Sequence, residues 1–271
     1  TLNEKDTVIL EITDSKGKLI RIYSNLKDGN YKKYPGGPAP ETLLSNQKGH
    51  NRFLWNFRTN TESPDVNGVF VLGSYAGYAV APGMCQAKLT LHPFNNSSAK
   101  QSNSTTLTVL PNPFIKASQE NWDLQQSTLA TISSNIKEVH TSVNNLRKIK
   151  KQLQYYAETL ASIPEAKSIK EEANSIIGKI DAWESNIVES RTQNGQDVIN
   201  WPSKLNVDFF YLKGLIDISD PRVTQGVKNK LADLQLQWKN EKEKVQGINT
   251  AVAEFNALYK NTSIEAIQNK W

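Results

Sequence analysis

The feature that most constrains the fold of this chain is a change in hydrophobic period at PNPF, residues 111–114. After this point apolar side chains recur every three to four residues, the period of an α-helix with one buried face. Before it, short apolar runs are separated by turn-forming residues, which is typical of β-strands. A chain of 271 residues is long enough to bury two cores. We therefore predict an α+β multidomain fold, with a β domain over residues 1–112 and an α-helical bundle over residues 113–271.

The helical half contains four apolar seams, each with three-to-four spacing. Pro164, Pro202 and Pro221 separate them, and short connections of this kind place consecutive helices antiparallel. The sequence predicts an elongated antiparallel bundle of three long helices and one short helix. In chain order, the first seam runs from Leu129 to Leu160, and the other three cover Ala166–Ile187, Pro202–Ile218 and Asp220–Phe255.

The β half contains six short segments with the composition or alternation of strands. DSKG at 14–17 is a turn signal, so the first two segments are expected to form a hairpin. Several short strands separated by turns within about 110 residues are typical of a small sandwich. The prediction from these residues is a small N-terminal antiparallel β-sandwich. Its expected strands are residues 7–12, 18–24, 51–58, 69–72, 84–91 and 105–110.

Two groups of aromatic residues leave a choice between a structural role and a binding role. Phe53, Trp55 and Phe57 occupy every second position, so in a strand they would share one face, either in a core or on an exposed platform for a ligand. The second group lies in Gly/Pro-rich loops, where a ring can stack on a sugar or pack against the protein. Its members are the candidate ligand-binding residues Tyr31, Tyr34, Tyr75 and Tyr78.

The sequence contains no recognisable catalytic, cofactor-binding or metal-binding motif. Cys85 is the one cysteine, and the three histidines lack the spacing of metal ligands. The net charge of +5 is spread without the concentrated basic patch of a nucleic-acid-binding domain. No apolar run reaches the roughly 18 residues that a membrane span needs. We therefore expect a region without enzyme activity, cofactor, nucleic-acid partner or transmembrane segment.

Five motifs follow one another along most of the chain. They are VILEITDSKGKLIR at 8–21, GHNRFLWNFR at 49–58, APG at 81–83, LTVLPNP at 107–113 and WPSKLNVDFFYLKGLIDISDPRVTQG at 201–226. Their order resembles the C-terminal region of bacterial sortilin/VPS10-like, BNR-repeat "glycosyl hydrolase" proteins, which are widespread in Bacteroidetes. The chain departs from that family at Asn112-Pro113-Phe114, where Asp-Pro-Arg is usual, and at MCQAKL, residues 84–89, which lacks the usual tyrosine.

The resemblance implies an Ig-like (FlgD-like) sandwich and a helical tail that follow a β-propeller. The implied role is that of a non-catalytic accessory or scaffolding region, which docks or supports the upstream propeller of a secreted, periplasmic or cell-surface protein. It also implies that the aromatic strand 51–58 packs between two sheets. The alternative is an independent module that binds a glycan or a protein through its tyrosine loops.

The start of the chain carries a further expectation. It opens on TLNEKDTVILEI without an initiator Met, which suggests a processed or excised piece of a longer protein. The resembling family has one more strand before this position. We therefore expect the first strand to lie at an open sheet edge, available to an upstream domain or to weak self-association.

Overall fold

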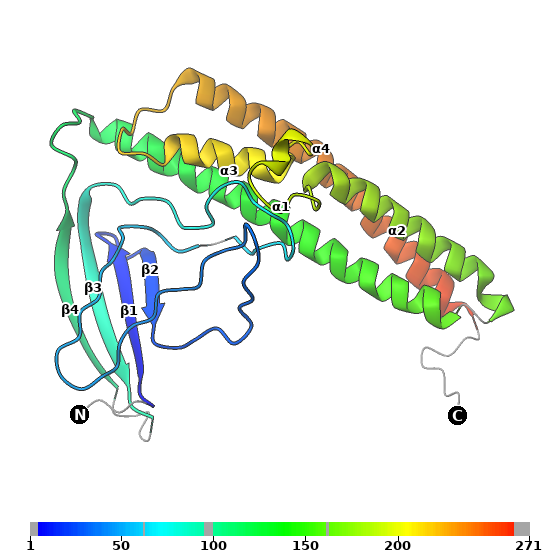
Figure 1. Cartoon of the computed structure of the whole chain (residues 1–271), viewed down its shortest axis with the longest axis horizontal. Coiled ribbons are helices and arrows are strands. Elements are labelled where there is room, and N and C mark those ends of the chain that lie inside the picture. The colour runs from blue at the N-terminus through cyan, green and yellow to red at the C-terminus, as the bar shows by residue number, and fades with distance from the viewer. Residues whose placement is uncertain (1–4, 62, 95–99, 161–162, 263–271) are drawn as a thin grey trace.

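The computed structural model of the protein describes residues 5–61, 63–94, 100–160 and 163–262. These residues form one antiparallel sheet and four α-helices, so the coarse α+β prediction is confirmed. Figure 1 shows the sheet at one side of a long helical assembly, with the irregular chain of residues 25–61 and 63–80 lying between the two.

The sheet consists of four strands in the order β2-β1-β3-β4. Their bounds are β1 Thr7–Asp14, β2 Leu19–Ser24, β3 Gly83–His92 and β4 Gln101–Val109. β1 and β2 form the predicted hairpin. At its turn the Asp14 carboxylate accepts hydrogen bonds from the backbone N–H groups of Lys16 and Lys18, both at 2.9 Å. Gly17 has a φ of +80°, a conformation that glycine adopts without steric cost.

The first strand, β1, lies in the interior of the sheet. It pairs with β2 on one side and, over its whole length from Thr7 to Asp14, with β3 on the other. The expectation of an open edge at the first strand is therefore wrong. The reason is topological, because β3 returns from a distant part of the chain to the side of β1 that a preceding strand would have occupied. The outer strands are β2 and β4.

The segments 51–58 and 69–72, both expected as strands, are not strands in the structure. Within the described residues, the first of them has one ladder contact, an isolated bridge between Arg58 and Ala79. Phe57 explains the interruption, since its φ of +57° turns the backbone out of the extended conformation. These segments thus do not form the second sheet that a sandwich needs. Irregular chain from residues 25–80 covers part of one sheet face in its place.

The covered face of the sheet has a small hydrophobic core. Phe53 and Trp55 are half-buried against it, and the ring of Phe53 lies edge-on to Tyr23 with 4.6 Å between centroids. Phe57 is exposed. The aromatic alternation therefore places two of its three side chains against a core, although the backbone there is not a strand. The buried members of this core are Val8, Ile12, Tyr23, Leu44 and Cys85.

The four predicted helices are present. Their bounds are α1 Gln119–Thr159, α2 Lys167–Ile187, α3 Leu205–Ile216 and α4 Gln225–Lys260, and two short 3-10 helices are η3 Pro164–Ala166 and η4 Asp197–Ile199. Ser118 and Thr224 cap α1 and α4, since their side-chain oxygens accept hydrogen bonds from backbone N–H groups of the first helical turn. At 1.5 Å per residue, α1 is about 60 Å long.

The helices pack along one another over the length of α1. Figure 1 shows α2 and α3 one after the other beside α1, both running opposite to it, while α4 lies along them. The predicted seams form the contact surfaces. Ile169, Ile176 and Ile180 of α2 are completely buried, as are Leu129, Ile132 and Val139 of α1. Trp238 of α4 is also buried, and its indole N–H donates a hydrogen bond to Glu138 of α1 at 3.0 Å.

The helical core also receives side chains from the irregular chain that precedes β3. Val66, Val69, Val71 and Tyr75 are buried in the same cluster as the seam residues of α1, α2, α3 and α4. These four side chains precede residue 112 in the sequence. The division of the chain at that residue stays a prediction, but the hydrophobic contacts themselves continue from one half into the other.

Candidate functional site: a groove on the sheet and the junction beside it

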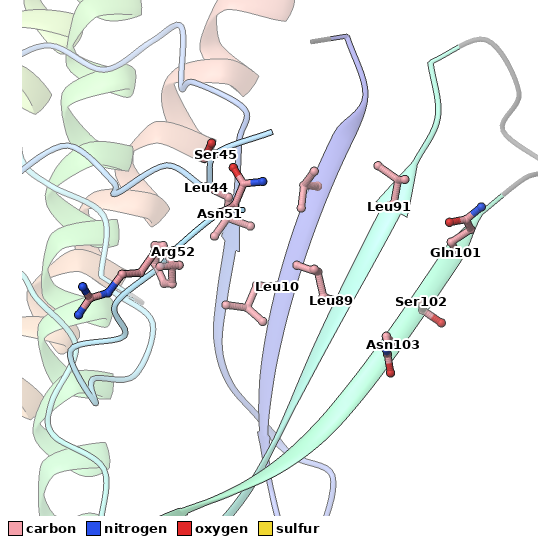
Figure 2. Close-up of a pocket in the computed structure, with 12 residues that line it drawn as sticks. Leu10, Leu44, Ser45, Asn51, Arg52, Leu89, Leu91, Gln101, Ser102 and Asn103 are labelled. Atoms are coloured by element: carbon pink, nitrogen blue, oxygen red, sulfur yellow. The ribbon is translucent and has the colours of Figure 1, made fainter. Parts of the chain in front are cut away.

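An apolar groove lies on the partly covered face of the sheet (Figure 2). Its floor is formed by β1 and β3, where Leu10 is paired with Leu89 and Val8 with Leu91. One wall comes from the irregular chain at Leu44 and Phe53. The opposite wall is the polar start of β4, residues 101–103. The groove has a volume of about 530 Å³.

The groove exists because the irregular chain covers only part of the sheet face. Leu44, Phe53 and Trp55 of this chain pack with the core of the sheet, but Leu89 of β3 remains 48% exposed although it points to the core side of the sheet. Among the described residues that line the groove, Arg52 is the one ionisable side chain and none is a carboxylate. This arrangement suits the burial of apolar side chains from another protein surface, because it offers hydrophobic area with a polar rim.

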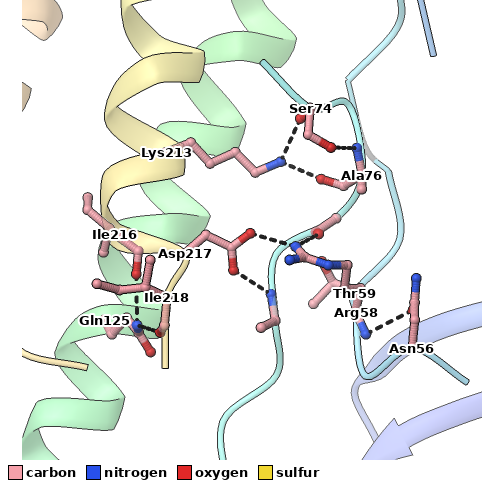
Figure 3. Close-up of polar contacts among 12 residues, drawn as sticks. Asn56, Arg58, Thr59, Ser74, Ala76, Gln125, Lys213, Ile216, Asp217 and Ile218 are labelled. Carbon is pink, nitrogen blue, oxygen red and sulfur yellow. Dashed lines mark hydrogen bonds and ion pairs between the residues drawn. The ribbon is translucent and has the colours of Figure 1, made fainter. Parts of the chain in front are cut away.

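A polar junction joins the sheet side to α3 (Figure 3). The Asp217 carboxylate follows the last turn of α3 and accepts hydrogen bonds from Arg58 Nη1 at 2.6 Å and from the Ala79 N–H at 2.9 Å. Arg58 Nη1 also donates to the carbonyl of Gly77 at 2.8 Å. The Asp217 side chain is 9% exposed. One buried carboxylate therefore fixes two separate points of the irregular chain.

Lys213, one turn earlier on α3, makes a second set of contacts with the same chain. Its ammonium donates to the carbonyl oxygens of Ser74, at 3.3 Å, and of Ala76 (Figure 3). Burial lowers the pKa of Lys213, and the nearby Asp217 charge acts in the opposite direction. Gln125 of α1 donates to the carbonyl of Ile216 at 2.8 Å and so holds the end of α3 against α1.

A third set of contacts involves α1. His140 Nδ1 lies 2.8 Å from the carbonyl oxygen of Pro64, and Asn144 donates to the carbonyl of Asp65 at 2.7 Å. His140 is completely buried, with its ring centroid 5.8 Å from that of Tyr75 and 5.6 Å from that of Phe210. This burial lowers the pKa of the imidazole. The position of His140 at this junction carries no local sequence signal, because its partners Pro64, Tyr75 and Phe210 lie far from it in the chain.

The four candidate tyrosines occupy different environments. Tyr31 donates to the carbonyl of Pro38 at 3.1 Å, and the Tyr34 hydroxyl lies 2.9 Å from the Asp65 carboxylate. Tyr75 is buried against Phe210, with 5.0 Å between ring centroids, and Tyr78 packs against the helical core. The structure brings Tyr34 and Tyr75 together, and burial raises the pKa of both hydroxyls. It does not gather all four rings on one surface.

A smaller polar cleft of about 340 Å³ lies beside these loops. Its lining includes residues 37–42, which contain two prolines, and residues 73–77, which contain two glycines, together with Arg21 and Arg58. Arg21 pairs with the Glu41 carboxylate, and Arg58 pairs with Asp217. Tyr75 is the one candidate tyrosine in the described lining of this cleft. The cleft therefore offers backbone groups and paired charges to a polar ligand.

No group of three or more His, Cys, Asp or Glu side chains in the described part of the chain is arranged to hold a metal ion. Of the helices over the described ranges, none combines the length and the apolar character that a membrane crossing requires.

Comparisons with protein-family models, with curated proteins and with solved structures gave no match. The structure itself defines an α+β protein in which a partly covered sheet is fastened to a long helical assembly.

Proposed function

We propose that this chain is a non-catalytic accessory or scaffolding region of a secreted sortilin- or BNR-type glycosyl-hydrolase-like protein, and that it docks or supports an upstream β-propeller. One observation carries the proposal. The sheet presents an apolar groove whose described lining contains a single ionisable residue, and the same half is fastened to a helical assembly that runs along α1, which is about 60 Å long. A docking face on a rigid support is what a scaffold needs.

The chemistry of the groove favours docking over catalysis. Glycoside hydrolysis commonly uses two carboxyl groups that face one cleft. The groove lining contains none, and in the polar cleft the lining carboxylate of Glu41 is already paired with Arg21. Both observations concern the described residues, and they support a region that binds another surface without acting on a substrate.

The relation to Ig-like (FlgD-like) sandwiches belongs to the same proposal. The four strands would correspond to one sheet of such a domain, and the irregular chain of residues 25–80 would take the place of the other. In this proposal the helices form an elongated antiparallel bundle that follows the sheet domain.

The test uses the region encoded upstream in the same reading frame, produced as a separate protein and titrated with the 271-residue chain by calorimetry. We expect binding, and we expect Leu89→Asp to weaken it at least tenfold, because a charge would enter the apolar contact. Met84→Asp is the matched control, since Met84 is 60% exposed on the same strand and does not line the groove. An upstream region without a propeller, or binding that Leu89→Asp leaves unchanged, would refute the proposal.

The alternative proposal is an independent module that binds a glycan or a protein through the tyrosine loops. The polar cleft beside Tyr75 is the observation that favours it. A glycan array probed with the isolated chain tests it directly. Reproducible binding that is lost in Thr42→Trp, at an exposed position in the lining of this cleft, but kept in Leu89→Asp would favour the module over the scaffold.

A further inference from the structure

The two edges of the sheet differ in how they are covered. At the β2 edge, the Ile22 N–H donates to the side-chain oxygen of Asn60 at 3.0 Å, and the Asn60 N–H donates to the Ile20 carbonyl at 2.9 Å. The β1–β2 ladder is also irregular between Ile12 and Thr13. Such features prevent further strands from pairing with an edge. The β2 edge is therefore closed.

The β4 edge has none of these protections in the described part of the chain. β4 pairs with β3 through an uninterrupted register from Gly83↔Val109 to Leu91↔Gln101, and it is the last strand on that side. Its sequence, QSNSTTLTV, contains no charge, no proline and no glycine. In an antiparallel ladder every second residue of an outer strand directs its N–H and C=O groups away from the sheet. β4 thus presents a regular row of backbone donors and acceptors.

We propose that β4 pairs antiparallel with β4 of a second copy of this chain, about a two-fold axis at Thr105. This position is the midpoint of the strand Gln101–Val109, so the register gives every residue of β4 an opposite residue. A two-fold contact of this kind joins the same surface of both copies and closes on itself. The product is a continuous eight-stranded sheet. This inference goes beyond the proposed function and does not rest on it.

The side chains of β4 suit a second copy of the same strand. In this register Thr105 faces Thr105, Ser104 faces Thr106, and Asn103 faces Leu107, so no like charges meet. Opposed Thr and Ser side chains stabilise a sheet modestly. The charged residue nearest the strand centre is Lys88 of β3, which pairs with Ser104. Ser104 faces Thr106 of the second copy, and that Thr106 pairs with Gln86 of its own sheet. The two copies of Lys88 therefore do not face each other.

The position of β4 also leaves room for the second copy. In Figure 1, β4 forms the free margin of the sheet on the side away from β2. From Gln101 to Thr106 its side chains are exposed. A second sheet can therefore approach in the plane of the first without displacing the helices.

The experiment is sedimentation velocity on the 271-residue chain over a series of concentrations. We expect a reversible monomer–dimer equilibrium. Thr105→Lys should weaken the dimer at least tenfold, because it places two like charges directly opposite each other. Thr105 is exposed, so the monomer should stay folded, which circular dichroism checks. Ile22→Lys on the closed β2 edge is the control and should leave the dimer unchanged, since Ile22 is also exposed.

A charge-complementation experiment tests the register itself. Thr105→Glu alone should weaken the dimer as Thr105→Lys does, whereas an equimolar mixture of the two variants should form a mixed dimer. A chain that stays monomeric at every concentration would overturn the proposal. A dimer that Thr105→Lys leaves intact, or that the mixture does not restore, would overturn it as well.

Discussion

The helical half and the sheet half bury their apolar side chains in different ways. In the helical half, seam residues such as Leu129, Ile169 and Ile180 have no exposed surface. In the sheet half the core is small, and Leu89 remains 48% exposed on the core side of the sheet. Helices satisfy their own backbone hydrogen bonds and can close on one another, whereas the sheet is covered by irregular chain whose backbone needs separate partners.

This difference shows that the sheet half depends on contacts with the helices. Its covering chain is held by His140 of α1, Lys213 of α3 and Asp217, which directly follows α3. The helical core provides an anchor for the irregular chain, and the irregular chain in turn covers the sheet. We therefore expect changes in the helical core to have the largest effect on stability, and changes on the sheet to have smaller effects.

The largest expected effect comes from a charge in the helical core. Ile180→Asp should lower the free energy of unfolding by about 4 kcal/mol or more, because an unpaired carboxylate would be buried. Denaturant unfolding followed by circular dichroism measures this change. Ser175→Asp is the matched control on the exposed face of α2 and should shift the midpoint little. Equal stability of the two variants would show that the seam is not a core.

The second prediction concerns the junction. Asp217→Ala should cost about 2–3 kcal/mol, because it leaves the Arg58 guanidinium and the Ala79 N–H without their buried acceptor. We expect hydrogen exchange to accelerate in residues 58–80 more than in α4. Asp208→Ala is the control, since Asp208 is 40% exposed and its pair with Lys230 is 3.9 Å long. Uniform acceleration over the whole chain would contradict a local role for Asp217.

The third prediction concerns the small core of the sheet. Trp55→Ala should cost about 2 kcal/mol, below the range for fully buried aromatic residues, because Trp55 is only half-buried against that core. Thermal unfolding provides the measurement. Its neighbour Leu54 is 73% exposed, so Leu54→Ala should change the melting temperature little. A Trp55→Ala variant as stable as Leu54→Ala would mean that the aromatic residues do not stabilise the sheet.

The smallest effect is a pH dependence from His140. Burial lowers the pKa of the folded imidazole below the value of about 6.5 expected in the unfolded chain. The unfolded state therefore binds more protons, and stability should fall as the pH drops below about 6.5 until the folded pKa is reached. His140→Gln should flatten this dependence, whereas His50→Gln, at an exposed position, should not. A wild-type chain without any loss of stability over this range would contradict the assignment.

The helices could be predicted from the sequence because an amphipathic helix has a local pattern, in which apolar residues recur every three to four positions. The seam from Ala166 to Ile187 alone predicts the buried face of α2, and the β1–β2 hairpin follows from its turn residues. The prediction of a strand at 51–58 is wrong because aromatic alternation indicates which side chains face a core. It does not indicate whether the backbone pairs with another strand. The positive φ of Phe57 could not be predicted, because a phenylalanine rarely adopts this conformation.

The candidate site was less predictable for a related reason. The groove depends on how far the irregular chain extends over the sheet, and the junction depends on contacts such as Arg58 with Asp217, which are 159 positions apart. Periodicity carries no information about contacts at that separation. The loop sequence around Tyr75 predicts an accessible ring, yet the ring is buried against Phe210.

The central claim is that the irregular chain fastens the sheet to the helices in one orientation. Spin labels at Lys88→Cys on β3 and Lys179→Cys on α2, both exposed, report the distance between the two halves. Cys85 is replaced by Ala, and excess unlabelled chain restricts the signal to distances within one molecule. The account predicts one narrow distance distribution that broadens in Asp217→Ala. A broad distribution in the chain with Asp217 intact would contradict it.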